Sequence, residues 1–194
     1  MSSSKLLRLG GLAAVLGAVL LIIVGLAQLV LNLFFLDPGA VSESAMAALY
    51  VQSALGLLGH VLLALGLIGL YVRQSEATGV FGLVSFLMIF LGMALPPGFE
   101  WGAVLTNLGW ALFGVASLQA RVYPRPAAIL LIIGAVLTGV FNNLLVALVA
   151  GGPGNILIYM SVGAEVVGNV AIAWLGYALF SGRGVAAEHP QPAR

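Results

Sequence analysis

Long apolar runs dominate the chain, and short polar or turn-forming segments interrupt them at five places. A helix that crosses a bilayer needs about 20 mostly apolar residues, because each residue advances about 1.5 Å along the helix axis. The pattern therefore predicts six membrane-spanning helices, near residues 7–36, 44–72, 78–95, 99–120, 126–150 and 155–181. The breaks carry proline, glycine or charge and are Asp37-Pro38-Gly39, Arg73 to Thr78, Pro96-Pro97-Gly98, Arg121 to Pro126 and Gly151 to Gly154.

Composition supports the same class of protein. The 194 residues are 62% hydrophobic and 7% charged, whereas soluble domains average roughly 25% charged residues. We expect an all-α polytopic membrane helix bundle, with one six-helix transmembrane domain over residues 1–182 and a short polar, disordered tail at 183–194. Leu9 to Leu36 is too long for the apolar core of a signal peptide, so we expect it to stay as a membrane helix.

Basic residues predict how the bundle is oriented, because short cytoplasmic loops carry an excess of lysine and arginine. With six spans, every basic residue falls on one side of the membrane, and both termini are then cytoplasmic. These residues are Lys5, Arg8, Arg73, Arg121, Arg125, Arg183 and Arg194.

Composition also excludes several kinds of chemistry. A net charge of +1, without a basic patch, argues against a nucleic-acid partner. The absence of cysteine rules out disulfides, thiolate metal sites and a cysteine nucleophile. No lysine lies within a predicted helix, and one of the two histidines, His189, lies in the tail. A retinal Schiff base, a multi-histidine zinc site and bis-histidine haem ligation are therefore not expected within the membrane, and we expect no cofactor or metal.

Three segments resemble those of a large group of uncharacterised small bacterial multi-spanning membrane proteins. They are the N-terminal Leu-Arg-Leu-Gly-Gly, the helix end Gly69-Leu70-Tyr71-Val72-Arg73-Gln74 and the turn from Arg121 to Pro126. The resemblance implies a multi-pass helix bundle in a bacterial inner membrane. It implies no catalytic residues.

The strongest chemical signal is Glu165, an acidic residue in the middle of the last apolar run. Ser161 lies one turn before it and Asn169 one turn after it, so the three side chains form a stripe on one helix face. An ionisable group at this depth costs free energy, so Glu165 is expected to face the bundle interior. His60, near the middle of the second helix, is the first partner to consider, although spacing does not establish whether they meet.

Other polar residues lie at comparable depth or nearer the outer side. Gln52, Gly56 and His60 share one face of the second helix, and five helices can point polar groups toward a common interior. The third predicted helix, 78–95, offers least and is expected at the periphery. The candidate ligand-binding or pathway residues are Glu165, His60, Asn169, Ser161, Asn142, Asn107, Thr106, Gln52 and Glu100.

Three functional hypotheses remain open. The favoured one is a polar cavity, open toward the outer side, that binds or transports a small polar or amphipathic molecule. The second is a non-catalytic scaffold, regulatory partner or homo-oligomer, in which Glu165 and the amide side chains only join helices. The third is a lipid-modifying enzyme, which ranks last because no second carboxylate lies at the depth of Glu165.

Overall fold

The computed structural model describes residues 3–34, 43–95, 100–145 and 156–182, and within these ranges it is helical and contains no strand. The predicted all-α class is therefore confirmed. The predicted tail and the turns at 37–39, 96–98 and 151–154 lie outside the described residues. The elements are α1 (Ser3–Phe34), α2 (Glu43–Ala94), α3 (Glu100–Ala120), α4 (Arg125–Gly139), the π-helical segment η1 (Val140–Leu145) and α6 (Ile156–Phe180).

The helix α2 folds back on itself at Gly79. This residue has φ 54° and ψ −135°, a conformation that is accessible to glycine and rarely adopted by residues with a Cβ atom. Tyr71 and Phe86 stack with ring centroids 4.7 Å apart, whereas 15 residues of straight helix would separate them by about 22 Å. The predicted break over Arg73 to Thr78 is wrong, because this segment lacks proline and glycine and stays helical up to the reversal.

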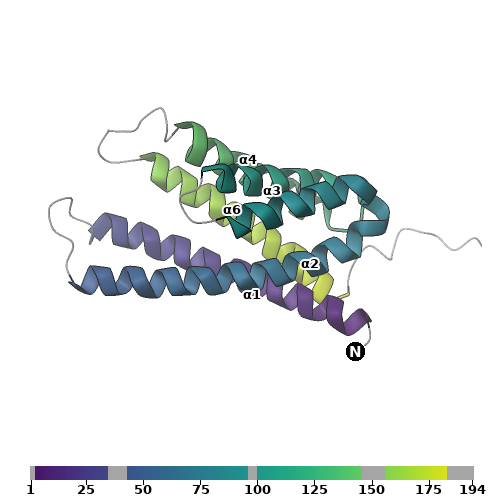
Figure 1. Cartoon of the computed structure of the whole chain (residues 1–194), viewed down its shortest axis with the longest axis horizontal. Coiled ribbons are helices and arrows are strands. Elements are labelled where there is room, and N and C mark those ends of the chain that lie inside the picture. Colours follow the sequence, from purple (N-terminus) through teal and green to yellow (C-terminus); the bar gives the residue numbers. More distant parts are fainter. Residues whose placement is uncertain (1–2, 35–42, 96–99, 146–155, 183–194) are drawn as a thin grey trace, which may run out of the picture.

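The helices form a ring of antiparallel neighbours (Figure 1). We call residues 43–78 of α2 its first limb and residues 80–94 its second limb. The first limb packs on α1, the second limb on α3, α3 on α4, α4 on α6, and α6 returns to α1. Ser4 and Gly182 consequently line one pocket, and we call this end of the bundle the terminal end.

Small residues allow the helices to approach closely. A Cβ atom added to Gly66 would lie 2.5 Å from the Cα atom of Ala14, and one added to Gly10 would lie 2.9 Å from the Cα atom of Gly69. Ala14 and Ala18 are fully buried in the same contact. Small residues therefore form the packing surface between α1 and α2.

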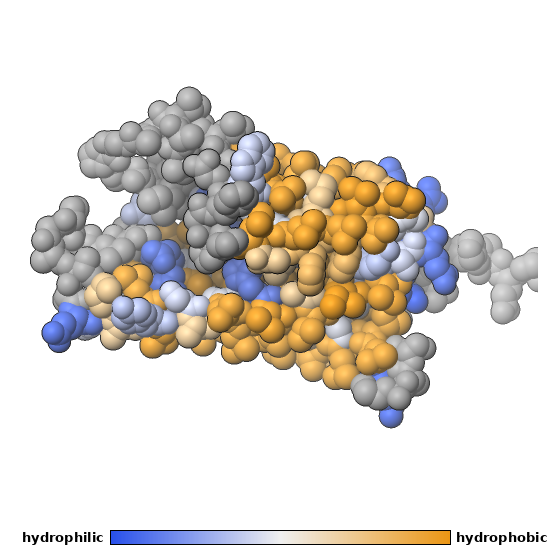
Figure 2. Space-filling model, in the orientation of Figure 1, coloured by the Kyte–Doolittle hydropathy of each residue, from blue (hydrophilic) through white to orange (hydrophobic). Residues whose placement is uncertain are grey.

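The molecule is apolar on its outside as well as in its core. Figure 2 shows a broad hydrophobic band over the helices, with hydrophilic residues at the right-hand, terminal end and others toward the left-hand end. Among the described residues, five helices are long and apolar enough to cross a membrane, which is the pattern of a membrane protein. The segments are Ser4–Leu31, Met46–Ala94, Trp101–Ala120, Arg125–Asn142 and Tyr159–Phe180.

Candidate functional site

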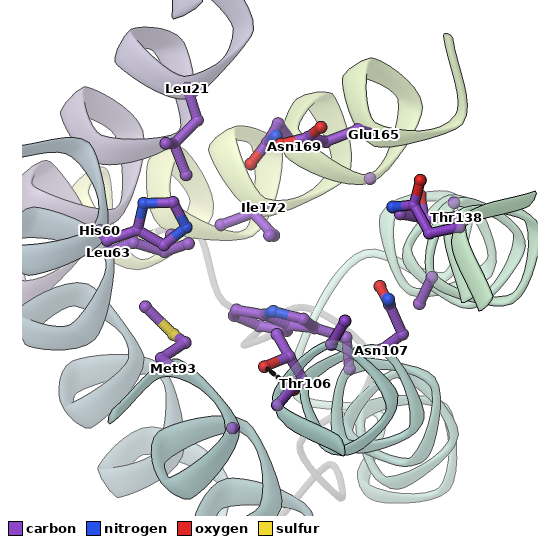
Figure 3. A pocket seen from close by; sticks show the side chains of 18 of the residues that line it. Leu21, His60, Leu63, Met93, Thr106, Asn107, Thr138, Glu165, Asn169 and Ile172 are labelled. Atoms are coloured by element: carbon purple, nitrogen blue, oxygen red, sulfur yellow. Dashed lines mark hydrogen bonds between the residues drawn. The ribbon is translucent and has the colours of Figure 1, made fainter. Parts of the chain in front are cut away.

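A cavity of about 790 Å³ lies between the helices, in the half of the bundle away from the terminal end (Figure 3). We call this half the cavity half and the other the terminal half. Every helix, together with η1, contributes to the cavity wall. The polar side chains in the wall are Ser53, His60, Thr106, Asn107, Thr138, Asn142, Glu165 and Asn169, and the larger apolar ones are Leu21, Leu57, Leu63, Met93, Leu95, Trp110, Leu131 and Ile172.

One face of α6 supplies the only acidic side chain among the described residues of the wall. Glu165, Asn169 and Ile172 are spaced four and three residues apart, so they follow one another along the face that borders the cavity. Asn169 is buried, and Glu165 is half-buried. Ser161, one turn earlier, instead donates its hydroxyl hydrogen to Oδ1 of Asn142 on η1. The predicted stripe is thus divided between the cavity and a helix-to-helix hydrogen bond.

His60 borders the cavity from the first limb of α2, across from the α6 face (Figure 3). Its Nδ1 atom lies 2.8 Å from the carbonyl oxygen of Gly56, one turn earlier. A carbonyl oxygen can only accept, so Nδ1 carries a hydrogen and donates it. The Nε2 atom is thereby left for other interactions. Within the described part of the chain, no hydrogen bond or ion pair joins His60 to Glu165, although both line the same cavity.

The α3 wall combines a hydroxyl, an amide and an indole. Thr106 donates its hydroxyl hydrogen to the carbonyl oxygen of Gly102 at 2.9 Å, which leaves the oxygen able to accept from a ligand. Asn107 lies beside it in the wall. Trp110, one turn further, is 6% exposed and packs edge-on against Phe113 with ring centroids 5.8 Å apart. Phe113 closes the wall toward the terminal half.

The second limb of α2 also forms part of the wall, through Gly92, Met93, Ala94 and Leu95. The prediction that this helix lies at the periphery is therefore wrong. A Cβ atom at Gly92 would lie 2.7 Å from the carbonyl oxygen of Gly102, so the two glycines bring this limb directly onto α3. Glycines on both sides of Pro96-Pro97-Gly98 in the sequence are a signal of this close contact, which the spacing of polar residues alone does not reveal.

Six of the nine predicted site residues line the cavity: Glu165, His60, Asn169, Asn142, Asn107 and Thr106. The other three do not contribute a described side chain to it. Gln52 turns toward α1, where its amide nitrogen donates to Oε1 of Gln28 and, at 3.4 Å, to the carbonyl oxygen of Val24. Ser161 is bonded to Asn142, and the side chain of Glu100 lies outside the described residues.

Two of the cavity residues that were not among the predicted site residues, Thr138 and Trp110, show different reasons for being missed. Thr138 is buried one helical turn before Asn142, so its place in the wall follows the 3.6-residue period. Trp110 continues the i, i+4 spacing of Gly102 and Thr106. An apolar side chain does not stand out in the sequence of an apolar helix. The four-residue spacing of Trp110 from the polar Thr106 was the signal that could have placed it in the cavity wall.

The charges in the wall are few. Among its described lining residues are one carboxylate, from Glu165, one imidazole, from His60, and no lysine or arginine. Nowhere in the described residues do three or more His, Cys, Asp or Glu side chains gather as metal ligands would. No family model, no curated protein and no solved structure matches this chain. The cavity geometry is therefore the observation that bears most directly on function.

Proposed function

We propose that the chain crosses the membrane six times, with both termini in the cytoplasm. The apolar stretch Met46–Ala94 supports this, because its 49 residues would extend about 74 Å as a straight helix, more than twice the roughly 30 Å hydrocarbon thickness. It reverses at Gly79, so each limb crosses once. Lys5 and Arg8 then lie on the same side as Arg73, and the resemblance to small bacterial membrane proteins favours the bacterial inner membrane.

The chain suits a labelling test of this topology, because it contains no cysteine. Single cysteines placed at Ser44 and Ser75 lie at opposite ends of the first limb of α2. In intact cells, a membrane-impermeant maleimide should label Ser44→Cys and leave Ser75→Cys unlabelled until the membrane is opened. Labelling of both in intact cells would contradict the proposed orientation.

We propose further that the cavity binds a small polar or amphipathic molecule and serves in its binding or transport. The observation that carries this proposal is the convergence of Glu165, His60 and Asn169 on one space that the side chains of the described residues leave open. A volume of about 790 Å³ falls within the roughly 300 to 1,000 Å³ of ligand pockets. Polar groups in a membrane protein are costly to retain without partners, and a polar ligand would supply them.

The lining favours a neutral or cationic ligand over an anion. An anion would meet the Glu165 carboxylate, and the lining residues that the structure describes include no lysine or arginine to balance its charge. A cation would meet that carboxylate together with the Trp110 indole, and aromatic faces attract organic cations. Leu57, Met93 and Ile172 add apolar wall on which the hydrocarbon part of an amphipathic ligand can pack.

The packing of the terminal half closes the cavity on that side, so a ligand would enter from one side of the membrane at a time. Leu67, Leu70 and Phe113 are fully buried between the cavity and the terminal end. Passage across the membrane would therefore need a rearrangement of these side chains, whereas binding from the cavity half needs none. In the proposed orientation, the cavity half faces outward.

Two probes of similar shape and opposite charge test the proposal: tetraphenylphosphonium and tetraphenylborate. Titration calorimetry of the purified protein in a neutral detergent should show tighter binding of the cation. Glu165→Gln should weaken cation binding by about tenfold, the loss of one charge-assisted interaction, and should strengthen anion binding or leave it no weaker, because the like charge is removed.

Glu76→Gln is the matched control. It removes the same charge as Glu165→Gln, but at an exposed residue near the terminal end that does not line the cavity. It should bind both probes as the unmodified protein does. Equal, weak binding of both probes by every variant would count against a cation-accepting cavity.

The scaffold hypothesis has its own supporting observation. Two side-chain hydrogen bonds join helices next to the cavity. One links Gln52 to Gln28, which do not line the cavity, and the other links Ser161 to Asn142 at its edge. If the polar residues served assembly alone, Glu165→Gln would leave probe binding, stability and oligomeric state unchanged. An enzyme is the least supported function, because the described part of the lining holds a single carboxylate.

A further inference from the structure

A second pocket, of about 180 Å³, lies at the terminal end, remote from the cavity. It collects residues from the start of α1, the end of the first limb of α2, the α3–α4 connection and the end of α6. Two of its residues are arginines, Arg8 and Arg73, which come from different helices. The remaining lining residues are Ser4, Leu7, Val122, Tyr123, Ala178, Leu179 and Gly182.

The two arginines have no negative partner among the described residues of this pocket. None of these lining residues is acidic, and neither arginine forms an ion pair with a carboxylate elsewhere in the described parts of the chain. Tyr123 is buried and donates its hydroxyl hydrogen to the carbonyl oxygen of Leu70 at 2.8 Å. Burial raises the pKa of this hydroxyl above its ordinary value, and the nearby Arg73 lowers it by less. The phenol is therefore neutral and does not balance the arginines.

The surrounding charge reinforces the positive character of the pocket. The described residues at the terminal end include five basic side chains and one acidic side chain, which gives a local net charge of +4. Two guanidinium groups converging without a counterion repel each other, and an anion would relieve that repulsion. The charged residues at this end are Lys5, Arg8, Arg73, Arg121, Arg125 and Glu76.

We infer that the terminal-end pocket binds the phosphate group of an anionic phospholipid, held between Arg8 and Arg73. The planar guanidinium group presents paired N–H donors that match the oxygens of a phosphate. Basic pockets between transmembrane helices on the cytoplasmic side are suited to such headgroups. This site depends on the membrane orientation proposed above and is independent of what the cavity binds.

A lipid fits this position better than free phosphate because apolar surface adjoins the charge. Leu6 and Leu9, on either side of Arg8, are 56% and 52% exposed, and Val72 beside Arg73 is 52% exposed. Acyl chains can pack on these side chains while the headgroup reaches the arginines. Inorganic phosphate could use the arginines alone.

The test compares lipids and variants by native mass spectrometry of the protein released from neutral detergent micelles. Phosphatidylglycerol should remain bound where phosphatidylcholine, which carries no net charge, does not. The double variant Arg8→Gln/Arg73→Gln should weaken phosphatidylglycerol binding by at least about tenfold, since each basic side chain contributes to binding an anionic headgroup.

The double variant Arg121→Gln/Arg125→Gln is the matched control. It removes the same charge from the same end of the bundle, and neither arginine lines the pocket. Its affinity should change less than about twofold. An equal loss in both double variants would overturn a specific pocket and leave only general attraction to the charged end.

Two further measurements test the role of the guanidinium groups and the identity of the ligand. Arg8→Lys/Arg73→Lys retains the positive charges that orient the protein but lacks the paired guanidinium donors, so it should fold and bind with an intermediate affinity. Unchanged affinity in this variant would contradict the paired-donor geometry. Inorganic phosphate at millimolar concentration should not displace phosphatidylglycerol, and full displacement would show that free phosphate, not a lipid, is the ligand.

Discussion

The two halves of the bundle are built from the same helices and packed in opposite ways. In the terminal half, Phe113, Leu67, Leu70 and Leu175 are fully buried and fill the space between helices. In the cavity half, the same helices enclose about 790 Å³ lined by polar side chains. One half thus holds the helices in register so that the other can stay open. Stability is expected to reside in the first and ligand binding in the second.

The hydrogen bonding of polar side chains also differs between the two halves. In the terminal half, Ser117 donates its hydroxyl hydrogen to Oε1 of Gln74 at 2.8 Å, and both side chains are fully buried. In the cavity half, Glu165 and His60 face a shared space without bonding to each other. In the terminal half this pair joins two helices, whereas the cavity half combines such bonds, as between Gln52 and Gln28, with polar groups that remain available to a ligand.

The largest effect on stability is expected from Phe113→Ala, because Phe113 is fully buried where the cavity ends. Truncating such an aromatic side chain loses its packing contacts and leaves a void, at about 3 to 5 kcal/mol. The free energy of unfolding, measured by dodecyl sulfate titration and far-UV circular dichroism, should fall by that amount. Leu57→Ala, at a 68% exposed cavity residue, should change it by less than about 0.5 kcal/mol. If both variants lost a similar amount of stability, the two halves would not differ in packing as described.

Gly66→Ala should have the next largest effect. Its new Cβ atom would lie 2.5 Å from the backbone of Ala14, so α1 and α2 must move apart, at about 1 to 3 kcal/mol. Gly163→Ala is the matched control on α6, where nothing lies within 4 Å of the added atom. That variant should be neutral or stabilised by up to about 1 kcal/mol, since alanine favours helix. The same titration measures both, and a tolerated Gly66→Ala would mean that the two helices do not rely on this contact.

Much of the fold follows from the sequence, because apolar run length dictates helix length in a membrane. The reversal was misplaced because Arg73 to Thr78 is polar and resembles a loop, whereas only Gly79 has the backbone freedom to turn. Glu165 and Asn169 were found together because four residues return to nearly the same helix face. Gln52 and His60 are eight residues apart, which leaves them about 80° out of alignment, so Gln52 reaches α1 instead of the cavity.

Ser117→Ala should cost about 1 to 2 kcal/mol by leaving Gln74 with a buried carbonyl oxygen that has no donor. The Nε2 atom of Gln74 already lacks a partner, so the amide would then be unsatisfied at both ends. Adding Gln74→Leu to this variant removes the orphaned amide and should recover most of the loss. A double variant as unstable as the single one would show that the cost came from packing. Ser53→Ala, at an exposed serine of the cavity half, is the control and should be neutral.

The smallest effect on stability, and the sharpest separation of the halves, is expected from Asn107→Ala. Asn107 lines open space, so its truncation leaves the packed terminal half intact and should change the free energy of unfolding by less than about 0.5 kcal/mol. Tetraphenylphosphonium binding should nevertheless weaken by about threefold to tenfold, since one polar or packing contact with the probe is lost. Ser117→Ala should give the reverse, with lowered stability and unchanged binding once folded. Calorimetry and unfolding titrations on both variants test this opposite pattern. If each variant changed both binding and stability, the two halves would act as one.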